Sequence, residues 1–76
     1  MTKSTNRYAI VVFWSDQDAS WIADAPDLKS CSAFGETREE AVAEIGDAIE
    51  AWISAAQEAG LAIPEARFQP QHEVAE

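Results

Sequence analysis

Hydrophobic residues form an unbroken run near the start of the chain. Residues 7–14 read RYAIVVFW, and β-branched and aromatic residues of this kind favour a strand. Strands that are apolar on both faces are normally covered on both. We therefore expect the chain's own helix to cover one face and a partner chain the other. Successive side chains alternate between faces, and the two apolar sets are Tyr8, Ile10, Val12 and Trp14, and Ala9, Val11 and Phe13.

A hairpin and a second strand follow this run. The polar stretch SDQDAS, residues 15–20, predicts a hairpin loop. WIADA, residues 21–25, predicts the second strand. Pro26 and Asp27 end it, because proline lacks the N–H that a strand ladder needs and aspartate favours turns.

A third strand leads directly into a helix. CSAF predicts a short strand that begins at Ser30 or Cys31 and ends at Gly35. Thr37 is a favourable helix N-cap, and Glu40 stands three residues later, as in a capping box. These signals predict a helix that begins immediately after Thr37.

The helix is expected to run from Arg38 to about Ala59, where Gly60 stops it. Its apolar residues recur at helical spacing and form one stripe. Gly46 lowers helix propensity, and we interpret it as a place where a strand approaches closely. The stripe consists of Val42, Ile45, Ile49, Trp52, Ile53 and Ala56, widened by alanines at 41, 48, 55 and 59.

These elements predict an α+β fold: an antiparallel sheet with one long helix packed on it, in the order β-β-β-α. A last short edge strand is expected around Ala66 to Gln69, giving β-β-β-α(-β). The expected organisation is a disordered N-terminus over residues 1–6, one domain over residues 7–69, and a C-terminal tail over residues 70–76. So small a domain often gains stability by pairing with another chain.

Charge narrows the range of partners. Fourteen acids against five bases give a net charge of −9, which argues against direct binding to nucleic acid or to an anionic membrane. Glu40, Glu44 and Asp47 share the polar face of the predicted helix, and no Lys or Arg follows any of them by four residues. This face is interpreted either as a contact for a basic partner or as a solvated surface.

The sequence contains few residues of the types that carry catalysis or bind cofactors. Cys31 is the only cysteine, and the only histidine, His72, lies in the expected tail, so we interpret Cys31 as a buried structural thiol in a reducing cytoplasm. No apolar run is long enough to span a membrane, and no signal peptide is recognisable. The candidate metal ligands are four aspartates, Asp16, Asp18, Asp24 and Asp27, but their spacing fits no known metal-binding loop.

The stretch WIADAPDLKSCSAFGETREEAVAEIGDAIEAWISAAQEAGLAIP resembles the HicB-like antitoxin family. The resemblance covers about Tyr8 to Pro64. Two positions depart from the family pattern: Ser30 replaces a usual Gly, and Glu36 stands where Asp is commoner. The matching positions are Pro26, Asp27, Leu28, Cys31, Gly35, Thr37, Glu39, Glu40, Ala41, Ala48, Gly60, Ile63 and Pro64.

The resemblance implies a partial RNase H-like fold and a binding role without enzymatic activity or cofactor. The expected partner is a small basic HicA-type toxin that cleaves mRNA, with Glu40, Glu44 and Asp47 as the candidate contact. Only residues 65–76 follow Pro64, too few for the DNA-binding module that many family members carry. The alternative function is a regulatory domain without a toxin. Under either function we expect a dimer or tetramer, with the candidate interface Tyr8, Ile10, Val12 and Trp14.

Overall fold

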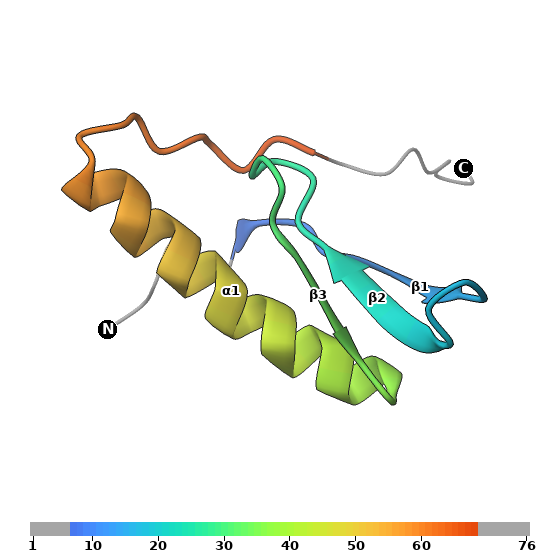
Figure 1. The fold of residues 1–76 in the computed structure, drawn as a ribbon. Coiled ribbons are helices and arrows are strands. Elements are labelled where there is room, and N and C mark those ends of the chain that lie inside the picture. The colour runs from blue at the N-terminus through green and yellow to red at the C-terminus, as the bar shows by residue number, and fades with distance from the viewer. Residues whose placement is uncertain (1–6, 69–76) are drawn as a thin grey trace, which may run out of the picture.

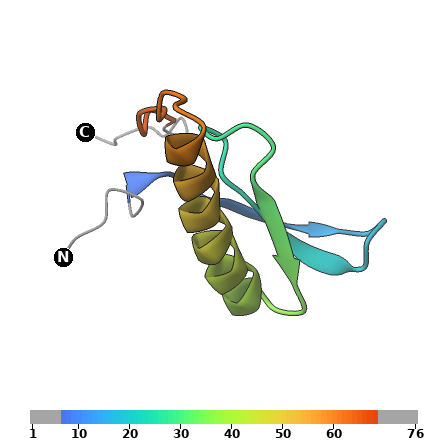
Figure 2. The same cartoon turned by 60° about the vertical axis from the view of Figure 1, so that its left-hand side comes forward.

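The computed structural model describes residues 7–68, which form a three-stranded antiparallel sheet and one long helix. The strands are β1 (Val11–Ser15), β2 (Ser20–Asp24) and β3 (Ser32–Gly35), ordered β1-β2-β3 across the sheet. The helix is α1 (Arg38–Glu58), and it lies against one face of the sheet (Figures 1 and 2). The predicted α+β class and the order β-β-β-α are confirmed.

The register of the strands sorts their side chains into two faces. Val12, Ala23 and Ala33 lie side by side across the three strands and pack toward α1. Phe13, Ile22 and Phe34 form the next row, and because neighbouring positions alternate, they point to the opposite face. No helix or strand within residues 7–68 covers that face.

The first strand begins later than predicted. Pairing with β2 starts at Val11 opposite Asp24, so the predicted start at Arg7 is wrong by four residues. The reason lies in the partner strand: the N–H of Ala25 already donates to the carbonyl of Cys31, and Pro26 then turns the chain away. The other strands shift by only one or two residues from their predicted bounds.

The segment from Pro26 to Cys31 consists of two consecutive turns. The N–H of Leu28 donates to Ala25 O at 3.0 Å, and that of Cys31 donates to Leu28 O at 3.3 Å. Trp52 in α1 holds the second turn through a 2.9 Å hydrogen bond from its indole to Lys29 O. Ser30 has φ +58° there, a left-handed conformation that glycine adopts at lower cost. The family's usual Gly is therefore explained by backbone geometry.

Both predicted ends of α1 are confirmed. Thr37 accepts a 3.0 Å hydrogen bond from Glu40 N, while the Glu40 carboxylate accepts one from Glu36 N, one residue beyond the usual capping box. At the other end Gly60 takes φ +75°. The amides of Gly60 and Leu61 donate back into the last turn of α1, as in a Schellman motif.

Close approach between helix and sheet occurs at Gly35, not at Gly46. A Cβ at Gly35 would lie 2.7 Å from the backbone nitrogen of Ala41, so any larger residue would push α1 away from the end of β3. A Cβ at Gly46 would meet no described atom within 4 Å. The interpretation of Gly46 as a contact point is therefore wrong.

The buried core lies between α1, β2 and the two consecutive turns of residues 26–31, which we call the double turn. Ile45 and Ile49 of α1 and Leu28 of the turn are its largest fully buried side chains. Val42, which the sequence places in the buried stripe, is 43% exposed and does not pack against the core; it lies beside Arg38 and Glu39. The complete buried set is Tyr8, Ala23, Ala25, Leu28, Cys31, Ala41, Ile45, Ile49 and Ala56.

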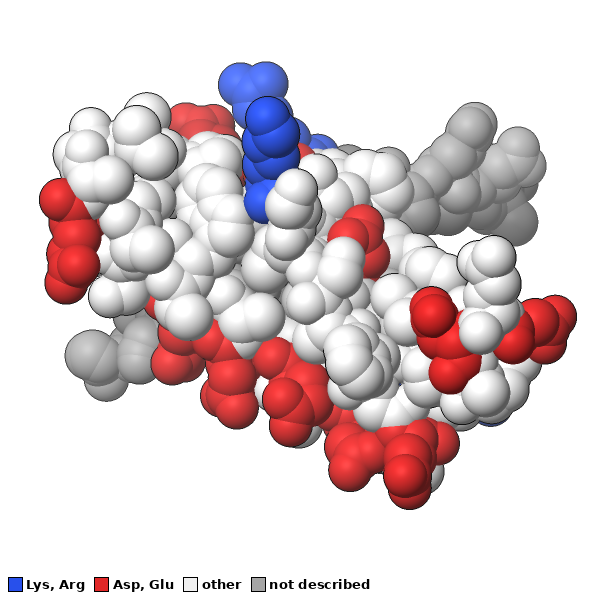
Figure 3. Space-filling view, viewed as in Figure 1, with Lys and Arg blue, Asp and Glu red and all other residues white. Residues whose placement is uncertain are grey.

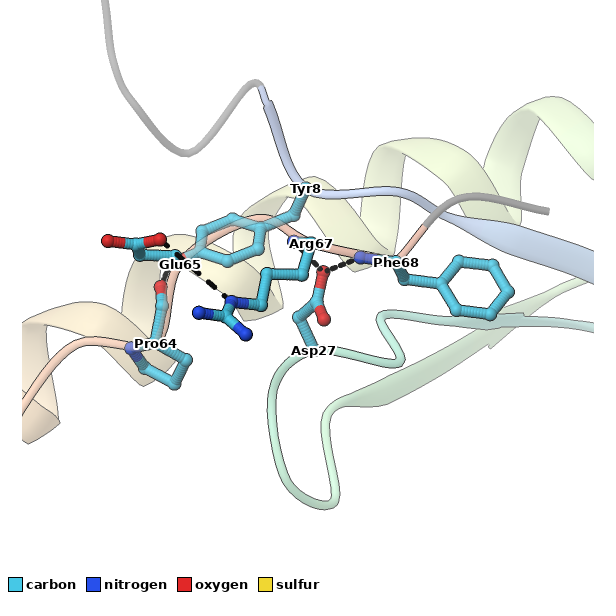
Figure 4. Close-up of polar contacts among 6 residues, drawn as sticks. All are labelled: Tyr8, Asp27, Pro64, Glu65, Arg67 and Phe68. Atoms are coloured by element: carbon cyan, nitrogen blue, oxygen red, sulfur yellow. Dashed lines mark hydrogen bonds and ion pairs between the residues drawn. The ribbon is translucent and has the colours of Figure 1, made fainter.

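Residues 61–68 run from the end of α1 back to the turn that holds Asp27, without forming a strand (Figure 1). The amides of Arg67 and Phe68 each donate a 2.9 Å hydrogen bond to one carboxylate oxygen of Asp27 (Figure 4). The Tyr8 hydroxyl donates to Pro64 O in the same segment. The Asp27 carboxylate thus accepts the two amide bonds that a strand ladder would use. The predicted strand is therefore absent over residues 66–68, while Gln69, the N-terminus 1–6 and the tail 70–76 lie outside the described residues.

Replacing Thr37 with Ala is expected to lower the free energy of unfolding by about 1 kcal/mol, because the amide of Glu40 loses its side-chain acceptor. Thr37→Ser keeps the hydroxyl and serves as the control. The measurement is the urea unfolding midpoint followed by circular dichroism. Equal midpoints for Thr37→Ala and the unchanged chain would show that the cap does not stabilise α1.

Candidate protein-binding surfaces

The three acids proposed as a partner contact lie on one exposed side of α1. Glu40, Glu44 and Asp47 are spaced by four and three residues, which places them on adjacent turns of the same helix side. All three are exposed. In the space-filling view the acidic side chains form a band along α1 and gather again near the hairpin end of the sheet, whereas the basic side chains visible there lie at the opposite edge (Figure 3).

A shallow hollow of about 490 Å³ joins this acidic side to the sheet. Glu40 and Glu44 line it from α1, Asp18 from the β1–β2 hairpin, and Phe34 and Glu36 from the end of β3. Four of its lining residues are acidic, and none of those described is Lys or Arg. Asp47 does not line it. The hollow therefore brings together acids from three parts of the chain around one exposed aromatic ring.

The residues expected at an oligomer interface divide into two groups. Tyr8 is buried, and Val12 packs partly against the core. Ile10 and Trp14 remain 36% and 47% exposed, beside the outer edge of β1, whose one partner among residues 7–68 is β2. Val12 and Trp14 point to the side of the sheet on which α1 lies, and Tyr8 belongs to the core, so these three residues do not form the uncovered face of the sheet.

Two tryptophans and an arginine extend this edge toward the start of α1. The rings of Trp14 and Trp21 meet edge to face with centroids 5.6 Å apart. The Arg38 guanidinium lies 4.8 Å from the Trp21 ring centroid, a cation–π contact. Arg38 thus lies away from the acidic side of α1 and does not neutralise it.

The four aspartates considered as metal ligands each accept a hydrogen bond within the described structure. Asp16 accepts from the Trp14 indole, Asp18 from Ser15, and Asp24 from Ser32. Asp27 accepts from the two amides of the C-terminal segment. Within residues 7–68 no group of three His, Cys, Asp or Glu side chains is arranged to hold a metal ion.

Cys31 is buried, as the sequence predicts for a structural thiol. Burial, and after it the nearby Asp24 carboxylate, raise the pKa of the Cys31 thiol above its usual value. Burial and then Asp27 likewise raise the pKa of the Tyr8 hydroxyl, which keeps it protonated as a hydrogen-bond donor to Pro64. Neither group has the depressed pKa of a nucleophile.

Residues 7–68 form a small α+β domain. Its candidate binding sites are the acidic side of α1 with the adjoining hollow and the edge of β1. The model of a family described as "HicB_like antitoxin of bacterial toxin-antitoxin system" matches residues 8–74 of the chain. Because this match spans most of the sequence, the chain belongs to the HicB-like antitoxin family. No curated protein and no solved structure matches it. In residues 7–68 there is no helix of the length and apolarity needed to cross a membrane.

Sequence reasoning identified the acidic side of α1 but missed the hollow beside it. The sequence predicts only that Phe34 belongs to a short strand. No nearby residue in the sequence indicates which face of that strand is covered. The signal that was present is alternation: Ala33 and Gly35 are small enough to lie under α1, which leaves Phe34 to point away.

We expect Cys31 to react with a thiol-specific reagent at neutral pH at least roughly tenfold more slowly in the folded chain than in urea. The reacting species is the thiolate, and both the raised pKa and the 3% exposure of the side chain disfavour it. The measurement is the rate of absorbance change with a chromogenic disulfide. Equal rates in the two states would contradict the structural assignment.

Proposed function

We propose that this chain is an antitoxin that neutralises a small basic HicA-type toxin, an mRNA-cleaving protein, by direct contact in the cytoplasm. Membership of the HicB-like antitoxin family supports the general role. The observation that carries the specific proposal is the exposed acidic side of α1, formed by Glu40, Glu44 and Asp47, which no described cation neutralises.

The substrate of such a toxin, mRNA, determines the charge of its binding surface. A protein that grips RNA presents Lys and Arg to the phosphates. An antitoxin that covers this surface gains by offering carboxylates, because complementary charge speeds encounter and disfavours wrong partners. Single exposed ion pairs contribute only about 0–1 kcal/mol. The main effect of the acidic side is therefore expected in the association rate.

Changing Glu40, Glu44 and Asp47 together to Lys should slow toxin association roughly tenfold or more and weaken its dependence on salt. The fold should persist, because all three side chains are exposed and the Glu40 amide still donates to Thr37. Glu40→Lys does remove the bond from Glu36 N to the Glu40 carboxylate, so the stability of the variant is measured alongside. The measurement is stopped-flow or surface binding with a HicA-type toxin held inactive by mutation. A parallel assay follows protection of mRNA from the active toxin.

The matched control carries the same change in net charge elsewhere, with Glu39, Glu50 and Glu65 changed to Lys. These acids are exposed and do not line the hollow. If the two triple variants slow association equally, only net charge matters. If neither differs from the unchanged chain, the acidic side of α1 is a solvated surface. A chain that binds no such toxin would instead be a regulatory domain without one.

We also propose that the chain self-associates as a dimer or tetramer through the edge of β1. The supporting observation is a free strand edge with Ile10 and Trp14 exposed beside it, where another chain can add hydrogen bonds and cover apolar surface. We expect the unchanged chain to form this dimer or tetramer at micromolar concentration.

Sedimentation velocity tests self-association. Ile10→Glu should shift the chain toward monomer, because it places a charge at the expected contact. Leu61→Glu is the matched control, since Leu61 is also exposed but lies beyond the helix end. A monomer as the only species of the unchanged chain at micromolar concentration would overturn this proposal.

A further inference from the structure

The face of the sheet opposite α1 is apolar and uncovered among the described residues. We call it the outer sheet face, and its apolar members are Val11, Phe13, Ile22 and Phe34. Phe13, Ile22 and Phe34 form one continuous row across the three strands. Phe34 is 69% exposed, the largest value for any large hydrophobic residue described. Exposed apolar surface of this kind with a polar rim marks an interaction site.

Acidic side chains surround Phe34. The 490 Å³ hollow on one side of its ring is lined by Asp18, Glu36, Glu40 and Glu44. A second hollow of about 260 Å³ on the outer sheet face is lined by Phe34, Ile22, Ser20 and again Asp18. Phe34 therefore lies between an apolar row and a cluster of carboxylates, and it lines both hollows.

We propose that Phe34 is the anchor of the antitoxin's contact with its basic partner, and that the acidic hollow takes a Lys or Arg side chain of that partner. This inference rests on the proposed function and specifies its site. The aliphatic stem of the partner's side chain packs on the Phe34 ring, and its charged head reaches the carboxylates of Glu36, Glu40 and Glu44. Apolar residues beside it cover Phe13 and Ile22.

Charge selects this occupant over a second copy of the chain. Two copies meeting on this face would bring their acidic rims together, and each chain carries a net charge of −9. Like charges placed opposite each other cost free energy, whereas a basic surface is attracted to the same rim. A central aromatic ring with polar groups around it is also the usual composition of a protein–protein hot spot.

The inference makes Asp47 less important than Glu44, although both lie on the same side of α1. Glu44 lines the hollow beside Phe34, and Asp47 does not. Glu44→Lys should therefore weaken toxin binding more than Asp47→Lys, even though the two variants change the net charge equally. Simple attraction between net charges predicts no difference between them.

The test measures the affinity of an inactive HicA-type toxin for Phe34→Ser, Phe34→Tyr and the unchanged chain. Phe34→Ser should weaken binding at least tenfold, mainly through faster dissociation, and Phe34→Tyr should stay within about threefold. Leu61→Ser is the matched control, because Leu61 is 62% exposed and lines neither hollow, and it should bind as the unchanged chain does. Circular dichroism and sedimentation are recorded for each variant.

The outcomes separate this inference from the proposed function. If the unchanged chain binds the toxin and Phe34→Ser binds equally well, the outer sheet face is not the contact, while the antitoxin role stands. If Phe34→Ser instead loses self-association and keeps its toxin affinity, a second copy covers the face and the inference is overturned. Absence of toxin binding by the unchanged chain overturns both proposals.

Discussion

Helix α1 can approach the sheet closely because the residues beneath it are small. Ala23 and Ala33 present only methyl groups to the helix, and at Gly35 even a methyl group would collide with the backbone of α1 at Ala41. The bulky side chains of the core come instead from the helix and the double turn, chiefly Ile45, Ile49 and Leu28. This division confines the core to one face of the sheet. The aromatic residues that alternate with the small ones then have no place in it and remain on the other face.

The same geometry explains where charge can accumulate. In α1, Glu40 and Glu44 form the acidic flank beside the end of β3. Arg38 lies over Trp21 of β2 and, with Glu39 and Val42, lines a separate shallow depression. Glu40 belongs to the cap of the helix as well as to its acidic flank, since its amide donates to Thr37 and its carboxylate accepts from Glu36. The start of α1 therefore fixes the position of part of the acidic surface, and a change of charge at Glu40 acts on both.

The ends of α1 were predictable from sequence because they depend on local bonds, those of Thr37 at the start and Gly60 at the stop. The ends of the strands were harder to predict. Strand β1 begins only where β2 offers a pairing partner, and Pro26 ends the part of β2 that can pair. The sequence pattern did not show which glycine lies close to the helix. It also did not show that Asp27 binds the amides of Arg67 and Phe68, because that contact joins residues distant in the chain. The acidic side of α1 followed from helical spacing, but the hollow around Phe34 required the register of the sheet.

The bonds from Asp27 to Arg67 and Phe68 join residues 40 and 41 positions apart, and the bond from Tyr8 to Pro64 spans 56 positions. The hairpin and the helix caps, by contrast, join residues only a few positions apart. Contacts that close long loops lose more chain entropy, so they form late unless other structure has already brought their ends together. Here the sheet and α1 do so, because the helix returns the chain to the level of the Pro26–Asp27 turn. The topology therefore predicts that residues 11–58 assemble first and that residues 61–68 then attach to a surface that already exists.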